Sequence, residues 1–335
     1  MPRSLPRVPR TPSRLRRLIA TLGLTLLAAP SLVLPAAAQM SDLKIMAPAA
    51  PGGGWDQTAR AMQQAIVTTG LARSVQVVNV PGAGGTIGLA QMASASKGDG
   101  NQLMVMGYVM VGAILTNKAP VTLDQITPIA RLTEETEAIA VPANSPLKTI
   151  QDLADAIKAN PAKVTWAGGS AGGVDHIAAG LFAQAAGADP SKINYIPFSG
   201  GGEALAAVLG GKVTAGISGY GEFESQVKAG KLRILAVTAK SRVPGVDAPS
   251  LTEAGIPLAI TNWRGVVAPS GISAEQRATL TALVEKMANS PAWADVLKQK
   301  GWDGALLTGE AFADFLKREN AQTTDILKSI GLVKP

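Results

Sequence analysis

The chain of 335 residues contains no cysteine and only one histidine, His176. Without thiols it has no disulfide framework, no thiolate metal site and no N-terminal cysteine to carry a lipid. A single histidine also disfavours a classical zinc site, which needs several nitrogen or sulfur ligands. We therefore expect neither a metal nor a cofactor.

Aromatic residues are scarce as well, at 4% of the chain. A pocket that stacks a large flat ligand therefore has few candidates, namely Trp55, Tyr108, Phe198, Tyr220 and Trp263. Long apolar runs are missing after residue 38, where none reaches the length of a membrane span. These absences favour a mature protein that is soluble.

The first 38 residues have the pattern of a secretory signal peptide. Residues 1–17 contain six arginines and no acidic residue, and an apolar run over 18–34 follows. The segment P-A-A-A-Q (35–39) supplies the small residues of a cleavage site, so we expect cleavage after Ala38. An uncleaved anchor is the alternative, because the run approaches spanning length. Its prolines and its small-residue end favour cleavage, and the predicted location is the bacterial periplasm.

Removal of this leader changes the charge of the protein. Its charged residues are all arginines, so 31 basic residues become 25 against 24 acidic ones, which leaves a formal net charge of +1. The mature chain therefore gives no support to binding of nucleic acid or of an anionic membrane. About 297 residues remain, enough for two modest domains or one large one.

The stretch V-T-W-A-G-G-S-A-G-G-V-D-H (164–176) predicts a short buried strand over 164–167, a loop over 168–173 and a helix that begins at Val174 or Asp175. Four of the six loop residues are glycines, so the backbone can bend sharply and a ligand can approach its amides. A helix N-terminus adds unpaired N–H groups and partial positive charge, which together make an anion site. The alternative is a tight turn that binds no ligand.

The same loop contains G-x-S-x-G, formed by Gly168, Ser170 and Gly172, in the strand-to-helix context of a nucleophile elbow. A serine hydrolase also needs a histidine base, which in that enzyme class comes late in the chain. His176 is the only histidine and follows Ser170 closely, opposite the apolar face of its own helix. The usual triad cannot be built, so Ser170 is interpreted as a hydrogen-bond donor to a ligand.

Three further glycine-rich loops follow predicted strands, at 52–54, 82–85 and 199–202. The loop at 82–85 is not a dinucleotide-binding G-x-G-x-x-G, because Ile87 stands where the last glycine is needed, and no phosphate-loop lysine follows. Strands that alternate with helices predict α/β architecture with parallel sheets, in which such loops lie at the carboxyl ends of the strands. We expect the four loops to line a cleft between two domains.

Other predicted elements frame these loops. Asp56 stands at the start of a helix, where it can pair with Arg60. Two strands are expected at 128–132 and 138–141, and the segment 142–146 is expected to cross between domains. Tyr108 is placed at the carboxyl end of a strand over 103–107, and an extended segment at 260–268 is expected to return to the first domain. Amphipathic helices at about 274–289, 291–300 and 309–330 close the chain.

Six motifs occur in order along the mature chain: P-G-G-G-W-D-Q-T-A-R (51–60), N-V-P-G-A-G-G-T-I-G (79–88), W-A-G-G-S-A-G-G-V-D-H (166–176), Y-I-P-F-S-G-G-G-E-A-L (195–205), A-G-K-L-R-I-L-A-V (229–237) and N-W-R-G-V-V-A-P (262–269). Together they resemble the periplasmic receptors of tripartite tricarboxylate transporters, the TctC/Bug type. The W-D-Q, G-G-S-A-G-G-V-D-H and N-W-R-G versions look closest to the citrate-binding branch.

The resemblance implies an α/β fold of the type II periplasmic binding class, with a ligand cleft between two domains. Domain 1 would comprise residues 39–142 and 263–335, and domain 2 residues 143–262. The implied function is non-enzymatic capture of a small polycarboxylate, citrate being the first expectation, and delivery to integral-membrane transporter subunits by a monomer. The expected ligand-binding residues are Gly52, Gly53, Gly54, Trp55, Asp56, Tyr108, Ser170, Ala171, Gly172, Gly173, His176, Ser199, Gly200, Ser218 and Glu222.

Two alternatives to a transport receptor stay open at this point. One is a secreted serine hydrolase that uses Ser170. The other is an accessory protein that presents a di- or aromatic carboxylate to a sensor kinase and transports nothing. His176 would add a cation below about pH 6.5 if it faced the cleft, since that is the ordinary pKa of histidine.

Overall fold

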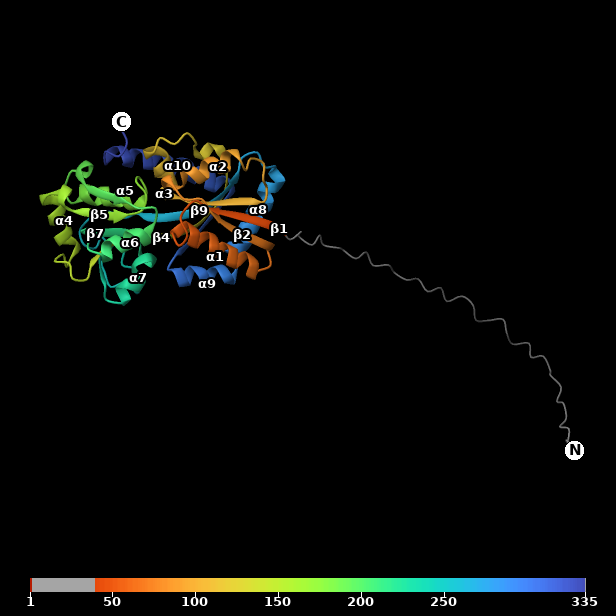
Figure 1. Cartoon of the computed structure of the whole chain (residues 1–335), viewed down its shortest axis with the longest axis horizontal. Helices are drawn as coiled ribbons and strands as arrows, with labels where there is room; N and C mark the ends of the chain where they lie inside the picture. The colour runs from red at the N-terminus through yellow and green to blue at the C-terminus, as the bar shows by residue number, and fades with distance from the viewer. Residues whose placement is uncertain (2–39, 335) are drawn as a thin grey trace. The chain divides into compact units, whose positions relative to one another are not determined.

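A computed structural model describes Met1 and residues 40–334; the predicted leader and its cleavage site lie outside the described residues (Figure 1). The helices and strands follow in the order β1 (Met40–Ala47), α1 (Gly54–Thr68), β2 (Ala72–Asn79), α2 (Thr86–Ser94), β3 (Gln102–Gly107), α3 (Tyr108–Thr116), β4 (Ile126–Pro142), α4 (Ile150–Ala159), β5 (Thr165–Gly168), α5 (Val174–Ala185), β6 (Asn194–Pro197), α6 (Gly201–Leu209), β7 (Ala215–Gly219), α7 (Tyr220–Lys228), β8 (Leu232–Val237), β9 (Thr261–Pro269), α8 (Ala274–Ala288), α9 (Pro291–Lys300), β10 (Asp303–Thr308) and α10 (Gly309–Ser329).

Two groups of strands share the long strand β4. In the first group β1 lies between β2 and β3 in parallel, β9 runs antiparallel to β3 and β4, and β10 also pairs with β4. In the second group β5 lies between β6 and β7 in parallel, and β4 runs antiparallel to β7 and β8. We call these groups, with the helices packed on them, the first and the second lobe. Figure 1 shows β4 and β9 where the lobes meet.

The strand β4 passes from one lobe to the other. Thr136 still pairs with Thr261 of the first lobe, whereas Glu137 pairs with Gly219 of the second. Pro142 pairs with Leu232, so the segment 142–146, expected to cross between domains, lies within the second lobe. The change of lobe falls earlier, at residues 136–137, and near residue 261 on the returning strand.

The expectation of two separate strands at 128–132 and 138–141 is wrong, because β4 is continuous. Register shifts between Pro128 and Ala130 and between Arg131 and Thr133 interrupt the alternation of apolar and polar residues, as bulges do. The polar run T-E-E-T (133–136) then looks like a break in the sequence. In the structure it stays extended, because Glu135 is buried in an ion pair with Arg264 of β9.

Helix α3 and strand β10 are not expected from the sequence. Helix α3 directly continues β3, and its residues Met110, Val111, Ala113 and Ile114 are all buried. A helix that is apolar on most sides has no amphipathic period to read. Strand β10 is half exposed and pairs with β4 alone. Its sequence therefore gives no clear signal of a strand either.

The two faces of β9 have different partners. On one face Trp263 packs edge-on against Phe312 and Phe315 of α10, with ring centroids 6.3 and 5.1 Å apart. Since side chains alternate along a strand, Asn262 and Arg264 lie on the other face, which borders the cleft. The aromatic packing fixes β9 from behind and so positions these two polar residues.

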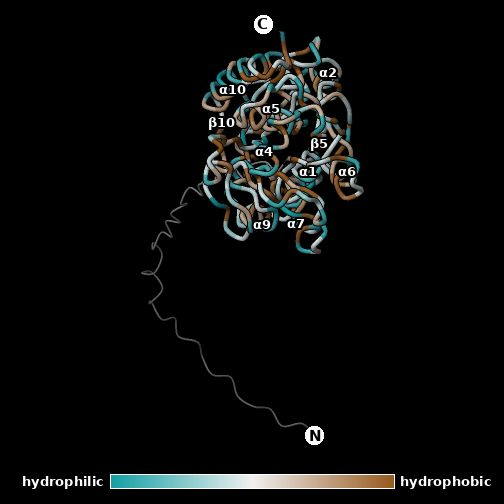
Figure 2. The backbone as a smooth tube through the Cα atoms, turned by 90° about the vertical axis from the view of Figure 1, so that its left-hand side faces the viewer, coloured by the Kyte–Doolittle hydropathy of each residue, from teal (hydrophilic) through white to brown (hydrophobic). Residues whose placement is uncertain are grey.

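Helices cover both lobes. Hydrophilic and hydrophobic residues alternate along α10, whose buried residues include Phe312 and Leu316 (Figure 2). The closing helices α8, α9 and α10 follow the predicted ranges to within two residues. Among the described residues, no helix has the length and apolar character needed to cross a bilayer.

Candidate functional site

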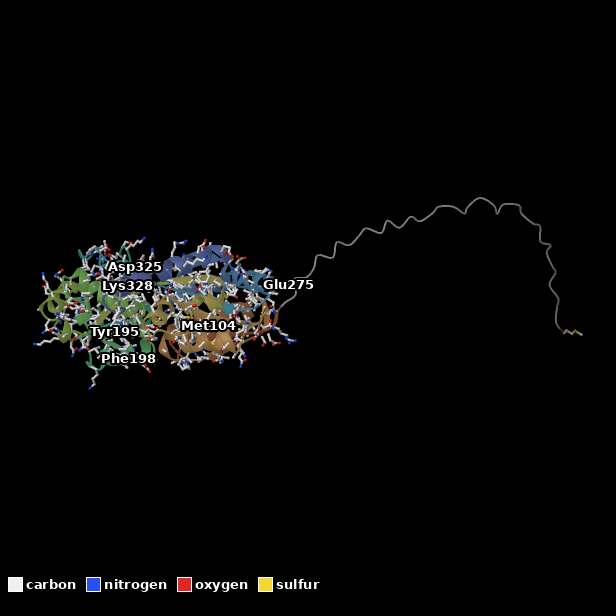
Figure 3. All side chains as sticks on the ribbon, turned by 90° about the horizontal axis from the view of Figure 1, so that it is seen from above. Met104, Tyr195, Phe198, Glu275, Asp325 and Lys328 are labelled. Carbon is white, nitrogen blue, oxygen red and sulfur yellow. The ribbon has the colours of Figure 1, made fainter. Side chains whose placement is uncertain are left out.

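A cavity of about 360 Å³ lies where the two lobes meet. The first lobe lines it with residues that follow β1 and β2, and the second lobe with residues that follow β5, β6 and β7. All four predicted glycine-rich loops contribute, which supports the expected convergence at the carboxyl ends of parallel strands. In Figure 3, the label Met104 marks the first lobe, and the labels Tyr195 and Phe198 mark the second.

The loop before α1 brings backbone amides to the cavity. Gly53 is the N-cap residue of α1 in an extended conformation, and no side chain caps the helix, so its first N–H groups are open to a ligand. A Cβ atom at Gly54 would collide with the guanidinium of Arg264. Glycine at this position lets a buried cation approach the helix N-terminus, and both groups attract an anion.

The loop 168–173 repeats this arrangement in the second lobe. Ser170 and Ala171 line the cavity, and Gly173 is the extended N-cap residue of α5, again without a side-chain cap. The Gly169 N–H donates to Asp175 Oδ2 at 2.7 Å, and the Tyr195 hydroxyl donates to the Gly169 carbonyl at 2.8 Å. These two bonds hold the loop from behind.

Nine of the expected residues line the cavity and six do not. Those in the lining are Gly53, Gly54, Trp55, Ser170, Ala171, Ser199, Gly200, Ser218 and Glu222. The six others, which lie near it or behind it, are Gly52, Asp56, Tyr108, Gly172, Gly173 and His176.

His176 does not have the cationic role considered from the sequence. Its ring stacks on Tyr195 with centroids 4.0 Å apart, and its Nδ1 accepts the Gly172 N–H at 3.2 Å. Burial lowers the pKa of His176 to about 4, so the ring is neutral at physiological pH. The side chain therefore supports the loop and brings no positive charge to the cavity.

Asp56 is a structural residue, as the pairing with Arg60 suggested. Its carboxylate accepts bonds from the Gly52 N–H, from Arg60 Nε at 2.9 Å and from Asn79 Nδ2 at 2.9 Å. Burial opposes ionisation, but these hydrogen bonds outweigh it and lower the pKa of Asp56. The carboxylate thus closes the loop before α1 and has little capacity left for a ligand.

Tyr108 and Gly172 are also turned away from the cavity. Tyr108 begins α3 and lies buried beside Glu319 of α10, and burial raises its pKa to about 12. Gly172 has a φ of +75°, and a Cβ there would collide with Thr116 of α3. Its role is to shape the loop.

The expected binding residues omit several polar residues of the cavity wall, among them Glu135, Asn262 and Arg264. Arg264 Nη1 and Nη2 donate to the two carboxylate oxygens of Glu135 at 2.7 and 2.9 Å, and both side chains are at least 93% buried. The guanidinium also lies 5.2 Å from the Trp302 ring centroid. The N-W-R-G motif contained the available signal, since Asn262 and Arg264 are two residues apart on one strand face.

Carboxyl groups gather around this ion pair. Burial, reinforced by Glu135, raises the pKa of Glu222 to about 7. Burial also raises the pKa of Asp175 to about 6, although its backbone hydrogen bond from Gly169 opposes the shift. Behind them Glu137 is fully buried with neither carboxyl oxygen hydrogen-bonded, and burial followed by repulsion from Asp175 raises its pKa well above the usual value. The cavity floor is therefore acidic.

A metal site is not formed by these acids. Within residues 40–334, no group of three or more His, Cys, Asp or Glu side chains is arranged to hold an ion. The same part of the chain contains no hydrogen bond between Ser170 and His176, and the Nδ1 of the histidine is engaged by Gly172. The contacts of a Ser–His pair are thus not assembled at the G-x-S-x-G loop.

Comparisons with known proteins agree with this geometry. A family model described as "Tripartite tricarboxylate transporter family receptor" matches residues 58–332. The protein BugT of Bordetella pertussis is 26% identical over 324 residues, covering 94% of this chain and 98% of that protein. The solved structure of the periplasmic binding protein BugD has a TM-score of 0.76 at 25% identity, covering 88% of this chain and 99% of the other.

A further solved structure supports the fold. MatC from Rhodopseudomonas palustris with bound malate has a TM-score of 0.75 at 24% identity, covering 88% of this chain and 100% of that one. These likenesses confirm the predicted two-domain α/β fold of the periplasmic binding class.

Proposed function

This chain belongs to the receptor family of tripartite tricarboxylate transporters, and on that premise we propose that it captures a small carboxylate between its lobes for delivery to the transporter's membrane subunits. Members of the family are periplasmic solute-binding receptors. The proposal places this protein in the periplasm after cleavage behind Ala38.

The observation that carries the proposal is the ring of backbone amides around the cavity. Loops from both lobes end there in helices α1, α5 and α6, whose N-cap residues are glycines without side-chain caps. Such N-termini favour carboxylates through their free N–H groups and partial positive charge. Each charge-assisted hydrogen bond contributes about 1.5–3 kcal/mol when buried.

The choice of carboxylate is a finer part of the proposal. The sequence resemblance favours citrate, and the related fold of MatC is known with bound malate. The acids of the cavity floor argue against a trianion, because Arg264 is the one cation among the described lining residues and is already paired with Glu135. We therefore infer a ligand with fewer negative charges than citrate.

The sensor alternative uses the same capture step, so it differs only in the partner that receives the loaded receptor. The hydrolase alternative gains no support, because the contacts of His176 are with Gly172 and Tyr195.

Two substitutions at the loop 168–173 test the carboxylate site. Ala171 lines the cavity and is not among the residues with positive φ, so Ala171→Asp adds a negative charge without straining the backbone. We expect it to abolish carboxylate binding in isothermal titration, since an anion beside an anion in a poorly screened cavity is strongly repelled. Ser170→Ala removes one hydroxyl and should cost about 1–3 kcal/mol of binding free energy.

The isosteric Ala171→Asn variant is the matched control, because it adds the same bulk without charge. Circular dichroism of each variant checks its folding. Carboxylate binding that survives unchanged in a folded Ala171→Asp protein would refute the amide-lined site. Ester hydrolysis that disappears in Ser170→Ala would instead support the hydrolase.

A further inference from the structure

The charges of the cavity lining are unbalanced. Four carboxyl side chains face one guanidinium, that of Arg264. The four belong to Glu135, Asp175, Glu203 and Glu222. Three of the carboxyls accept bonds from nitrogen donors, which are Arg264 for Glu135, the Gly169 N–H for Asp175 and the Ser199 N–H for Glu203. Glu222 accepts only from the Ser218 hydroxyl within the described residues. It therefore has acceptor capacity left at the cavity.

A second, independent observation concerns Asn262. Its side chain lines the cavity and the residue is 6% exposed, yet Oδ1 has no hydrogen-bond partner among the described residues. A buried polar atom without a partner is costly unless a ligand or water supplies one. The orphaned atom is an acceptor, so the missing partner is a donor.

Glu222 and Asn262 border the same part of the floor. Asn262 is the cross-strand partner of Glu135 in the β4–β9 ladder. The Glu135 carboxylate in turn lies against Gly219, the N-cap residue of α7, in whose first turn Glu222 lies. A Cβ at Gly201 would collide with Glu222, so the Glu222 carboxyl lies close under the N-terminus of α6. Both acceptors are therefore neighbours of Glu135, Asn262 across the strand ladder and Glu222 at the first turn of α7.

We propose that the receptor selects an amino carboxylate, whose ammonium group donates to Glu222 and to Asn262 Oδ1 while its carboxylate lies on the amides of the glycine-rich loops. This inference rests on the proposed function and adds the substrate class and two specificity-determining residues. The ligand's ammonium group donates a hydrogen bond to Asn262 Oδ1, which otherwise lacks a partner, and also neutralises the Glu222 carboxylate. A hydroxy or plain carboxylate of the same length supplies no such charge.

The proposal has a characteristic dependence on pH. Glu222 is faced by Glu135 and Glu137 of β4, Asp175 of α5 and Arg264 of β9. Its pKa of about 7 means that it gains charge between pH 6 and 8. An ammonium ligand binds the ionised form better, so its affinity rises over this interval. A plain dicarboxylate is repelled by the ionised form, so its affinity falls. The pKa of Asp175 is lower, at about 6, and its ionisation changes the two affinities in the same directions.

Isothermal titration of the mature protein with matched ligands tests the proposal. The probes are aspartate, malate and succinate, which differ only in an amino, hydroxyl or hydrogen substituent, and the corresponding pair glutamate and glutarate. We expect the amino member of each set to bind roughly ten- to hundredfold more tightly, as one buried charge-assisted bond allows.

Variants separate a role in specificity from a role in folding. Glu222→Gln should weaken the amino ligand at least tenfold and strengthen succinate, because a neutral amide oxygen replaces the charged partner of the ammonium and the charge that repels succinate is lost. Asn262→Asp keeps an acceptor and should retain amino-ligand binding, whereas Asn262→Leu should lose it. Glu310→Gln changes the net charge equally on an exposed side chain of α10 and should change neither affinity.

The outcomes distinguish this inference from the function on which it rests. Tight malate or succinate binding, with aspartate no better and with Glu222→Gln shifting all ligands alike, would overturn the amino-carboxylate assignment and leave the carboxylate receptor standing. No binding by any member of the panel, at pH 6 or pH 8, would overturn both.

Discussion

At the residue scale, Gly172 and Gly202 illustrate two different settings for glycine in the loops next to the cavity. Gly172 has a φ of +75°, and a Cβ there would collide with the Thr116 side chain. Gly202 lies in the first turn of α6, and nothing lies within 4 Å of its Cβ position. The backbone requires the first glycine, whereas nothing packed around the second requires glycine there.

Alanine at these two positions should therefore change stability in opposite directions. We expect Gly172→Ala to lower the free energy of unfolding by about 2–4 kcal/mol, through positive φ and overpacking together. Gly202→Ala should raise it by up to about 1 kcal/mol, since alanine favours the helix. Urea denaturation of both variants measures the difference. Equal stabilities would contradict the conformation assigned to the loop 168–173.

Glu222 should make the stability of the ligand-free protein depend on pH. Its pKa is raised to about 7 in the folded state, above the ordinary value of a glutamate, so the folded protein binds the extra proton between these values. The state with more bound protons is favoured at low pH, and stability therefore falls as pH rises from about 4.5 to 7. His176 opposes this trend below pH 6.5, because its pKa is lowered to about 4.

Glu222→Gln isolates the part of this trend that belongs to Glu222. Near pH 5 the glutamate is protonated and resembles glutamine, so the two proteins should melt together. At pH 8 the variant should melt higher by roughly 3–6 °C, since it has no buried charge. Thermal unfolding monitored by circular dichroism at both pH values checks the prediction. A constant difference between the two proteins at all pH values would contradict the raised pKa.

The residues found from the sequence are those of local motifs. Ser170, Ala171 and the glycines of the four loops stand out because strand, loop and helix follow one another directly. Arg264 and Asn262 belong to a strand, and their meeting with Glu135 depends on a register between segments far apart in the sequence. His176 was misjudged for a related reason, since its neutrality depends on burial beside Tyr195. A local sequence pattern carries no information about burial by residues that are distant in the chain.

At the scale of elements, agreement follows the strength of the local signal. Helix α4 begins with a capping box, a local sequence motif in which Thr149 and Asp152 exchange side-chain to backbone hydrogen bonds. The range of α9 agrees fully with the helix predicted over 291–300. Helix α3 was missed because it is buried on most sides, and the middle of β4 was missed because its polar residue Glu135 is buried in an ion pair with Arg264. Tertiary contacts overrode the local pattern in both places.

At the scale of the molecule, the lobes touch across the cavity that they enclose. The Gly172 carbonyl lies against Gly112 of α3, so closely that a Cβ at Gly112 would collide with it. The Thr116 hydroxyl donates to the Ala171 carbonyl at 3.3 Å, and the Cβ position of Gly200 is 3.8 Å from Gly53 Cα. Because both lobes line the cavity and touch beside it, we predict that they separate when a ligand enters.

The strands that connect the lobes indicate where such a movement takes place. Strand β4 changes partners between residues 136 and 137, and the chain returns to the first lobe at residue 261, beside the Thr238–Ile260 hydrogen bonds. A few residues at these two crossings can absorb a hinge rotation while both sheets stay intact. The domain boundaries expected at 142–143 and 262–263 would place the hinge slightly further along the chain.

Ligand binding should therefore close the protein, because contacts from both lobes favour the closed form in proportion to their differential affinity. We expect small-angle X-ray scattering to give a smaller radius of gyration at saturating ligand than without it. A carboxylate that does not bind in titration serves as the control for ionic effects. At a ligand concentration of about 100 times Kd the bound form gains about 2.7 kcal/mol of stability by mass action. Identical scattering profiles from protein that shows this thermal shift would mean that the ligand enters without hinge motion, and the clamp would have to be abandoned.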